Sequence, residues 1–230
     1  MEKKDFIVWT SKLEGLYKPS EETTKKLSQI DLYAIVGPTG VGKTTIMEKL
    51  GVPYVQSDVS RDKRPEEKNN KNYHFRSDYV EIITEIKNGD YVQFLIGNKA
   101  EFYGTRLSSY PEQGPCTMAV FAREVNKFQS LGFRKVVPLY IMPPSYVEWM
   151  RRIGGVRAKD LLSRISEARD SLLNAMNRDD FHYILNDNVE AAVADIRRVM
   201  KGEHLDEHRE QLAVGTADIL LERIGEDVLD

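Results

Sequence analysis

Short apolar runs alternate with amphipathic helical segments along most of this chain. Runs of this length, bounded by glycine and polar residues, predict buried strands, and apolar positions spaced three and four apart predict helices. The expected strands are Leu32–Val36, Val52–Ser57, Tyr91–Ile96, Cys116–Phe121, Lys135–Ile141 and His182–Asn186. The main expected helices are 44–50, 77–89, 145–153, 159–176 and 189–200, with further helices at both ends. This alternation predicts an α/β fold with a parallel sheet flanked by helices.

Several predicted elements carry local signals at their ends. Ser20, either Ser77 or Asp78, and Ser145 are expected to cap helices, and Glu148 completes a capping box with Ser145. Pro138 indicates an edge position or an irregularity in its strand, because proline has no N–H for a ladder. The helix that starts at 77 or 78 has an apolar stripe made of Val80, Ile83 and Ile86.

A glycine-rich loop joins the first expected strand to the next helix. It fits G-x-x-x-x-G-K-[ST], with Gly37, Gly42, Lys43 and Thr44 at the fixed positions. Backbone N–H groups converge on a phosphate in such a loop, and the helix dipole favours the anion. The lysine would reach the β- and γ-phosphates, and the Thr44 hydroxyl would bind Mg²⁺. The expected ATP contacts in this loop are Gly37, Pro38, Thr39, Gly40, Val41, Gly42, Lys43, Thr44 and Thr45.

The composition is that of an ordinary water-soluble domain. The chain has 230 residues, of which 41% are hydrophobic and 30% charged, and its net charge of −3 gives no reason to expect a nucleic-acid partner. No apolar stretch is long enough for a membrane span, and the N-terminus lacks the pattern of a signal peptide. The single cysteine, Cys116, fits a reducing cytoplasm and is expected to be a core residue.

Further motifs follow the phosphate loop in a fixed order. They are Ser57-x-x-x-Arg61-x-x-Arg64, Tyr73-His-Phe75, Tyr103-Gly-Thr105, Ile141-Met-Pro-Pro-Ser145 and Leu185-Asn-Asp187. With them, the chain resembles the guanylate kinase family of nucleoside monophosphate kinases. The resemblance covers about residues 31–200 and implies a P-loop NTPase fold with an inserted monophosphate-binding subdomain and a short lid.

The resemblance also implies roles for individual residues. The expected monophosphate contacts are Ser57, Arg61, Arg64, Tyr73, Gln93, Tyr103 and Thr105. Asn186 is expected beside ATP, and the residues expected to support the transfer itself are Lys43, Arg64, Arg157 and Arg164. Arg152 competes with Arg157 for the lid position, because the lid is shorter here than is usual for the family. Arginine suits these places because its planar fork gives bidentate, permanently charged donors.

Two residues expected to contact the base differ from those of the family. The family binds guanine with a glutamate and an aspartate, and Gln93 and Ala119 occupy those places here. An amide offers one donor and one acceptor where a carboxylate offers only acceptors. Glu101 or Glu124 could supply a displaced acid.

The resemblance divides the chain into a core and two extensions. An N-terminal helical extension (1–30) and a C-terminal helical extension (201–230) flank the core at 31–200. Within the core, 52–110 is the expected monophosphate-binding subdomain and 143–165 the expected lid. The amphipathic extensions could form a homodimer.

Three functions are open at this stage. The first is transfer of the γ-phosphate of ATP to GMP or dGMP. The second is the same reaction on a non-guanine monophosphate, which the substitutions at 93 and 119 would permit. The third is a degenerate binding module, which the intact phosphate loop disfavours.

Overall fold

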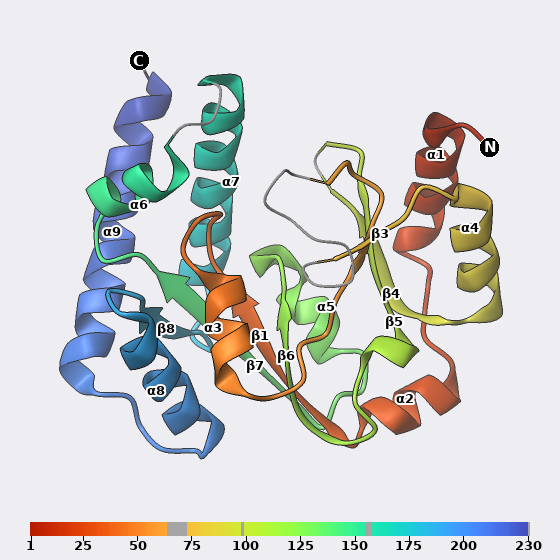
Figure 1. Cartoon of the computed structure of the whole chain (residues 1–230), viewed down its shortest axis with the longest axis horizontal. Helices are drawn as coiled ribbons and strands as arrows, with labels where there is room; N and C mark the ends of the chain where they lie inside the picture. Colours follow the sequence, from red (N-terminus) through yellow and green to blue (C-terminus); the bar gives the residue numbers. More distant parts are fainter. Residues whose placement is uncertain (64–72, 98, 155–157, 230) are drawn as a thin grey trace. The chain divides into compact units, whose positions relative to one another are not determined.

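The computed structural model describes residues 1–63, 73–97, 99–154 and 158–229 (Figure 1). Its contacts divide the chain into two compact units, each with its own sheet. The first unit contains Met1–Leu32, Pro53–Cys116 and Phe128–Lys135. The second contains Tyr33–Val52, Thr117–Lys127 and Val136–Asp230.

A four-stranded sheet in the order β6-β1-β7-β8 lies mainly in the second unit. Its strands are β1 (Ile30–Val36), β6 (Gly114–Ala119), β7 (Lys135–Met142) and β8 (His182–Leu185). Its helices are α3 (Lys43–Leu50), α6 (Tyr146–Ile153), α7 (Ala158–Met176), α8 (Val189–Met200) and α9 (Glu207–Leu229). β7 and β8 pair in parallel, and α8 and α9 both contact β8. The predicted α/β class with a parallel sheet is confirmed.

Pro138 predicted either an edge position or an irregularity in its strand, and the edge position is wrong. β7 lies between β1 and β8, so it is an inner strand of the sheet. The recorded pairing with β8 begins at Leu139, opposite His182. Pro138 precedes the first residue paired with β8, so its missing N–H takes nothing from that pairing.

The predicted helix caps are confirmed. Ser20 accepts a hydrogen bond from the N–H of Thr23 at the start of α2 (Glu21–Leu27). Asp78, rather than Ser77, caps α4 (Tyr79–Asn88), and Ser145 caps α6. The remaining short elements are η1 (Leu107–Ser109), η2 (Ala122–Glu124) and α5 (Val125–Gln129).

The first unit has a mixed sheet in the order β3-β2-β5-β4. Its strands are β2 (Asp58–Val59), β3 (His74–Phe75), β4 (Tyr91–Ile96) and β5 (Phe102–Arg106). β2 is parallel to β3 and antiparallel to β5, which is antiparallel to β4. The strand predicted at Val52–Ser57 is wrong, because this segment has only an isolated bridge at Tyr54 and β2 starts at Asp58. Pro53 lies inside the predicted run and cannot donate to a ladder.

The register of β4 and β5 places two pairs of side chains on one face of this sheet. Gln93 lies opposite Thr105, and Leu95 lies opposite Tyr103. Opposed residues of antiparallel strands share a face, and residues two apart along a strand return to it. Three of the residues expected at the monophosphate site therefore share one face of the sheet.

The other face of the same strands is aromatic. A register shift between Tyr91 and Gln93 turns the Tyr91 ring to this face, beside Phe102. A Cβ on Gly104 would come within 2.7 Å of atoms in both rings. Only glycine leaves room for this packing, which explains the middle residue of the Tyr103-Gly-Thr105 motif.

Two helices cover the aromatic face. α1 (Lys3–Glu14) contacts β4 and α4 (Figure 1), and the buried ring of Phe6 stacks on Tyr79 with 4.8 Å between centroids. The α4 stripe is corrected here, because Val80 is 55% exposed whereas Ile82 is fully buried. Tyr79 reaches the Phe6 ring, so the buried face of α4 runs through Ile82 rather than Val80.

A buried ion cluster joins the strands of this sheet to α4. The fully buried Asp58 accepts from Tyr91 Oη at 2.6 Å and from Arg76 at 2.7 Å. Arg106 lies 3.2 Å from the same carboxylate, and Glu85 lies 3.0 Å from Arg76. Several donors to one buried carboxylate offset its loss of hydration. The cluster thus fixes the residues that follow Ser57 in the chain.

Neither extension supports the homodimer predicted through them. α1 buries its apolar face within the first unit, and α9 buries Ala213, Ala217, Leu220 and Ile224 within the second. Within the described ranges, no helix has the length and hydropathy needed to cross a membrane.

The hydrogen bond between Tyr17 and Tyr91 gives a test of how firmly the N-terminal segment is attached. Tyr17 Oη donates to the Tyr91 carbonyl at 2.6 Å, and burial, with Asp90, raises the pKa of Tyr17 to about 12. Tyr17→Phe is expected to lower the free energy of unfolding by about 1 kcal/mol in urea titrations. Tyr183→Phe is the control, because the Tyr183 hydroxyl has no recorded hydrogen-bond partner among the described residues. Equal losses in both variants would contradict the assignment.

Candidate nucleotide-binding site

The glycine-rich loop lies between β1 and α3, as the sequence predicts. Gly42 caps α3 with a left-handed backbone, at a φ of 94°. A Cβ at this position would lie 2.6 Å from Asn186 Nδ2. Glycine is needed here both for the φ angle and for the close approach of the amide. The loop therefore places backbone N–H groups at the N-terminus of α3, which is the geometry that binds phosphate.

Lys43 and Thr44 occupy the first turn of α3. Lys43 Nζ donates to the carbonyls of Gly37 and Pro38, at 2.6 and 2.8 Å. These contacts hold the ammonium over the loop, where anionic oxygens would replace the carbonyls as stronger acceptors. Thr44 is half-buried, and no hydrogen bond of its hydroxyl to another described residue is recorded. A hydroxyl at the helix start suits one ligand of an oxygen-coordinated cation.

Helix α6 supports the loop through contacts that the sequence did not predict. Trp149 is fully buried, and its Nε1 donates to the Thr39 carbonyl at 2.8 Å. Ile153 lies against Gly40, where an added Cβ would come within 2.5 Å of it. The only available signal was the i, i+4 spacing of two apolar residues after the Ser145 cap, which indicates a buried face but not its partner.

Asn186 connects the end of β8 to the loop. It is 2% exposed, and its Nδ2 donates to the Val41 carbonyl at 2.6 Å. Its Oδ1 is buried and has no hydrogen-bond partner in the described chain. Arg152 donates to the Asn186 carbonyl at 3.3 Å and to Glu148 at 2.8 Å. Asn186 and Arg152, both expected near ATP, therefore lie together beside the phosphate loop.

Glu148 links two arginines of α6. Its carboxylate accepts from Arg151 and Arg152, and these hydrogen bonds, that of Arg151 first, lower the pKa of Glu148 to about 2. The side chain therefore does not complete the predicted capping box, although its N–H donates to Ser145. The arginine pair outcompetes the Ser145 N–H because a charged donor makes the stronger bond.

Of the three remaining arginines expected to act in the transfer, the structure describes one. Arg164 is half-buried on α7 and has no recorded hydrogen bond or ion pair with a described residue. Its guanidinium is therefore not neutralised by a neighbouring carboxylate in the described chain. Arg64 and Arg157 lie outside the described residues.

The residues expected around the acceptor phosphate gather in the first unit. Arg61 lies over the rings of Tyr73 and Phe75, at 5.0 and 5.4 Å from their centroids. Ser57 accepts a backbone bond from His74 N, which ties the segment before Arg61 to β3. Stacking on two rings fixes the plane of the guanidinium, and Arg61 Nη1 also donates to the Asp62 carbonyl at 3.0 Å.

Tyr103 lies close to this group. Its hydroxyl donates to Glu101 at 3.1 Å, and burial, followed by the charge of Glu101, raises the pKa of Tyr103 above its usual range. The phenol therefore stays protonated and can donate to a phosphate oxygen. Glu101, which could have replaced the missing acid at the base, instead accepts from Tyr103.

Gln93 lies further along the same face. It is 2% exposed, and its Nε2 lies 3.4 Å from the Thr105 hydroxyl, which bonds Tyr110 at 2.9 Å. Its Oε1 is buried and has no partner among the described residues. A buried carbonyl without a donor costs stability, so the site favours a ligand N–H at this point.

No group of three or more histidine, cysteine or acidic side chains in the described ranges could hold a metal ion by itself. A magnesium ion in a site of this kind is bound largely by substrate phosphates, with few protein ligands. The Thr44 hydroxyl fits that arrangement.

Cys116 is fully buried, and burial, with Asp31, raises its pKa to about 12, which confirms it as a core residue.

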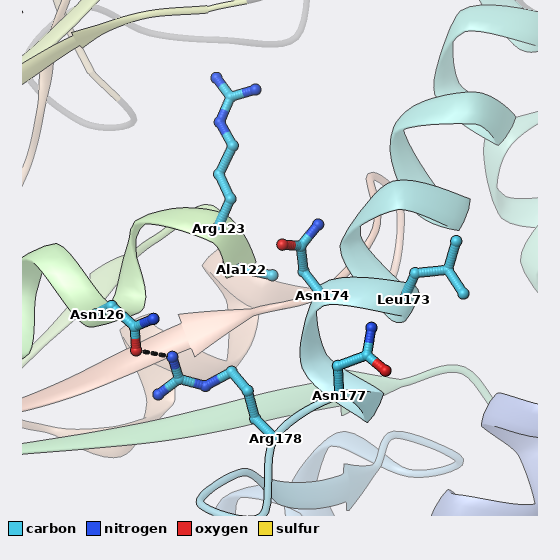
Figure 2. Close-up of a pocket in the computed structure, with 7 residues that line it drawn as sticks. All are labelled: Ala122, Arg123, Asn126, Leu173, Asn174, Asn177 and Arg178. Carbon is cyan, nitrogen blue, oxygen red and sulfur yellow. Dashed lines mark hydrogen bonds between the residues drawn. The ribbon is translucent and has the colours of Figure 1, made fainter.

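Figure 2 shows a separate hollow in the second unit, of about 280 Å³. It is lined by Ala122, Arg123, Asn126, Leu173, Asn174, Asn177 and Arg178. Its arginines pair with neighbours, because Arg178 donates to Asn126 and Asp180, and Arg123 lies 3.5 Å from Glu124. None of its lining residues is among those expected to bind nucleotide, and the hollow lies below the usual volume of ligand pockets.

Comparison with known proteins shows the family of this chain. The family model "Guanylate kinase" matches residues 29–203. The chain belongs to the guanylate kinase family. It is 29% identical to the guanylate kinase of Thermotoga maritima over 193 residues, which span 78% of this chain and 90% of that protein. It is 30% identical to a guanylate kinase of Streptococcus thermophilus over 189 residues, covering 75% of this chain and 87% of that protein.

A solved guanylate kinase supports the fold. The crystal structure of the guanylate kinase from Anaplasma phagocytophilum matches 78% of this chain and 88% of its own with a TM-score of 0.57, at 22% sequence identity. The region matched by the family model, residues 29–203, includes the phosphate loop and Asn186. It leaves out α1 and α9, so the contacts of these helices are additions to the matched region.

Proposed function

We propose that this guanylate kinase family member transfers the γ-phosphate of ATP to GMP or dGMP, giving ADP and the corresponding diphosphate. The observation that carries the proposal is the support of the phosphate loop from three directions. Trp149 holds the Thr39 carbonyl, Asn186 holds the Val41 carbonyl, and Lys43 lies across Gly37 and Pro38. Catalysis of phosphoryl transfer depends on positioning and charge rather than on a covalent intermediate, so hydrogen bonds that hold the loop in place serve the reaction.

The donor side of the reaction is assigned to the second unit. The loop N–H groups bind the ATP phosphates, and Lys43 neutralises charge on the β- and γ-phosphates. Thr44 would hold Mg²⁺, which supplies positive charge between the phosphates when it is bound. Two of the arginines expected in the transfer are described and could stabilise charge on the transferring group. They are Arg152 and Arg164, and Arg164 is half-buried with no recorded carboxylate partner among the described residues.

The acceptor side is assigned to the first unit. Arg61, Tyr73 and Tyr103 bind the acceptor phosphate, and Thr105 and Gln93 face the base. The roles of Arg64 and Arg157 remain predictions from the sequence, as do a cytoplasmic location and the role of Mg²⁺.

A coupled assay of ADP release across the common ribo- and deoxynucleoside monophosphates tests the function. No release above ATP hydrolysis with any acceptor would overturn it.

One observation favours a second candidate, the same reaction on a non-guanine base. Gln93 presents a neutral amide where the family's carboxylate is expected, and its buried oxygen has no hydrogen-bond partner among the residues described. One donor and one acceptor side by side fit the Watson–Crick edges of several bases. The acceptor assay distinguishes the two candidates directly. A degenerate binding module is disfavoured by the intact loop and would show nucleotide binding without ADP release.

Replacing Arg61 tests the acceptor assignment. Arg61→Ala is expected to raise the KM for the monophosphate about tenfold, because one charge-assisted bond contributes about 1.5 kcal/mol, with the KM for ATP nearly unchanged. Arg134→Ala is the matched control, because Arg134 is an exposed arginine of the same unit that pairs with Asp31 at 2.8 Å. Initial rates with each substrate varied in turn provide the measurement. Equal losses for both nucleotides in Arg61→Ala would refute the assignment.

A further inference from the structure

Helix α9 lies beyond the region matched by the guanylate kinase family and packs within the second unit, which also contains the phosphate loop. It contacts β8, α7 and α6, all within the second unit (Figure 1). Ala213, Ala217 and Leu220 form its buried stripe. The small residues of the stripe bring the helix axis close to β8. The first turns of α9 therefore lie near the residues that follow β8.

Arg209 projects from the start of this helix into that segment. Its guanidinium donates to the Leu185 carbonyl at 3.0 Å and to both carboxylate oxygens of Asp187, at 3.0 and 3.3 Å. Its Nε donates to Asp195, a carboxylate on α8 that is 6% exposed, at 2.8 Å. All three nitrogens of the planar fork are used, and a lysine could not reproduce this set of directions.

The residues that Arg209 holds flank Asn186 on both sides. Between these fixed neighbours, Asn186 donates to the Val41 carbonyl of the phosphate loop at 2.6 Å. Asn186 is almost fully buried, and its amide lies so close to Gly42 that a side chain at position 42 would collide with it. The hydrogen bonds of Arg209, with a smaller effect of the Asn188 N–H, also lower the pKa of Asp187, so the contact is an ion pair at neutral pH.

We propose that Arg209 is a positioning residue for the ATP site, acting through Asn186 on the phosphate loop. The proposal rests on the proposed function only in taking this loop as the ATP site. Arg209 touches neither the loop nor any residue expected to contact the phosphates directly. Its effect should therefore fall on ATP affinity, through the orientation of the loop, and leave the acceptor site unchanged.

The test is the affinity of the full-length chain for ATP, measured by calorimetry and compared with its affinity for GMP. Arg209→Ala is expected to weaken ATP binding about tenfold, a change of about 1.4 kcal/mol, and GMP binding less than about twofold. Arg209→Lys keeps the charge but loses the fork, so an intermediate loss of ATP affinity is expected. This variant also keeps the test decisive if Arg209→Ala does not fold.

Two control variants separate positioning from stability. Asp195→Asn weakens the link between Arg209 and α8 but leaves the contacts with Leu185 and Asp187. Arg197→Ala removes a different arginine clamp, in which Arg197 donates to the carbonyls of Lys49 and Leu50 at the end of α3. Both are expected to lower the melting temperature while ATP affinity stays within about twofold of the wild type.

The outcomes are distinct. ATP affinity within twofold of the wild type in Arg209→Ala, or equal losses for ATP and GMP, would overturn the positioning role. An equal loss of ATP affinity in Arg197→Ala and Arg209→Ala would also overturn the positioning role, because general destabilisation would then explain both losses. Failure of the proposed function would appear differently, as an absence of phosphoryl transfer in the wild type itself.

Discussion

Lys43→Ala is expected to lower kcat by about a thousandfold while leaving the melting temperature nearly unchanged. In the structure, Lys43 Nζ lies 2.6 and 2.8 Å from the carbonyls of Gly37 and Pro38, so the ammonium is already held over the loop that is proposed to bind the phosphates. Removing one preorganised charge from the site of a developing negative charge typically costs about 10²–10³ in rate, and the loss of ATP binding adds to it.

A second lysine on the same helix is the natural control for this experiment. Lys49, near the end of α3, pairs with Glu190 at 2.6 Å and is largely exposed. Lys49→Ala removes the same charge from the protein without changing the loop. Steady-state kinetics should show nearly normal turnover in Lys49→Ala, and circular dichroism should show that both variants fold. Transfer by Lys43→Ala within tenfold of the wild type would refute the ATP site.

Gln93→Glu is expected to shift kcat/KM toward GMP, relative to AMP and IMP, by about ten- to a hundredfold. The wild-type amide offers guanine one acceptor, whereas a carboxylate accepts from both N1–H and the 2-amino group in charge-assisted bonds of about 1.5–3 kcal/mol each. The wild type should consequently prefer GMP less strongly than the guanylate kinase of Thermotoga maritima assayed beside it. A site discriminates strongly only through polar groups that a wrong ligand leaves unpaired.

The burial of Gln93 adds a second readout. Gln93 is 2% exposed beside Thr105, so a carboxylate at this position should lower the melting temperature in the absence of nucleotide. GMP should restore more stability to Gln93→Glu than to the wild type, because a tighter ligand stabilises the folded state more. Scanning calorimetry with and without GMP measures this difference.

Glu101 provides the competing explanation, because it could accept from guanine in place of the missing acid. The structure places its carboxylate on Tyr103 Oη, at 3.1 Å. Glu101→Ala is therefore expected to change phosphate affinity slightly and base preference little. Strict GMP preference in the wild type that is unchanged in Gln93→Glu and lost in Glu101→Ala would reverse the assignment.

The sequence determined the features that depend on local spacing. The strand, glycine loop and helix around Lys43 follow from residues within a few positions of one another, as do the caps at Ser20, Asp78 and Ser145. These elements satisfy backbone groups with side chains close by in the chain, so their pattern is complete in the sequence. The order of the motifs was likewise enough to indicate the family.

The tertiary structure decided which side chains meet. The register shift between Tyr91 and Gln93 puts one in the aromatic core and the other beside Thr105, although both belong to one apolar run. Trp149 reaches Thr39, and Arg209 reaches Asp187, across long stretches of chain. No periodicity specifies such pairs, because they form only when packing brings separate elements together, and that same packing buries Ile82 and places Pro138 in an inner strand.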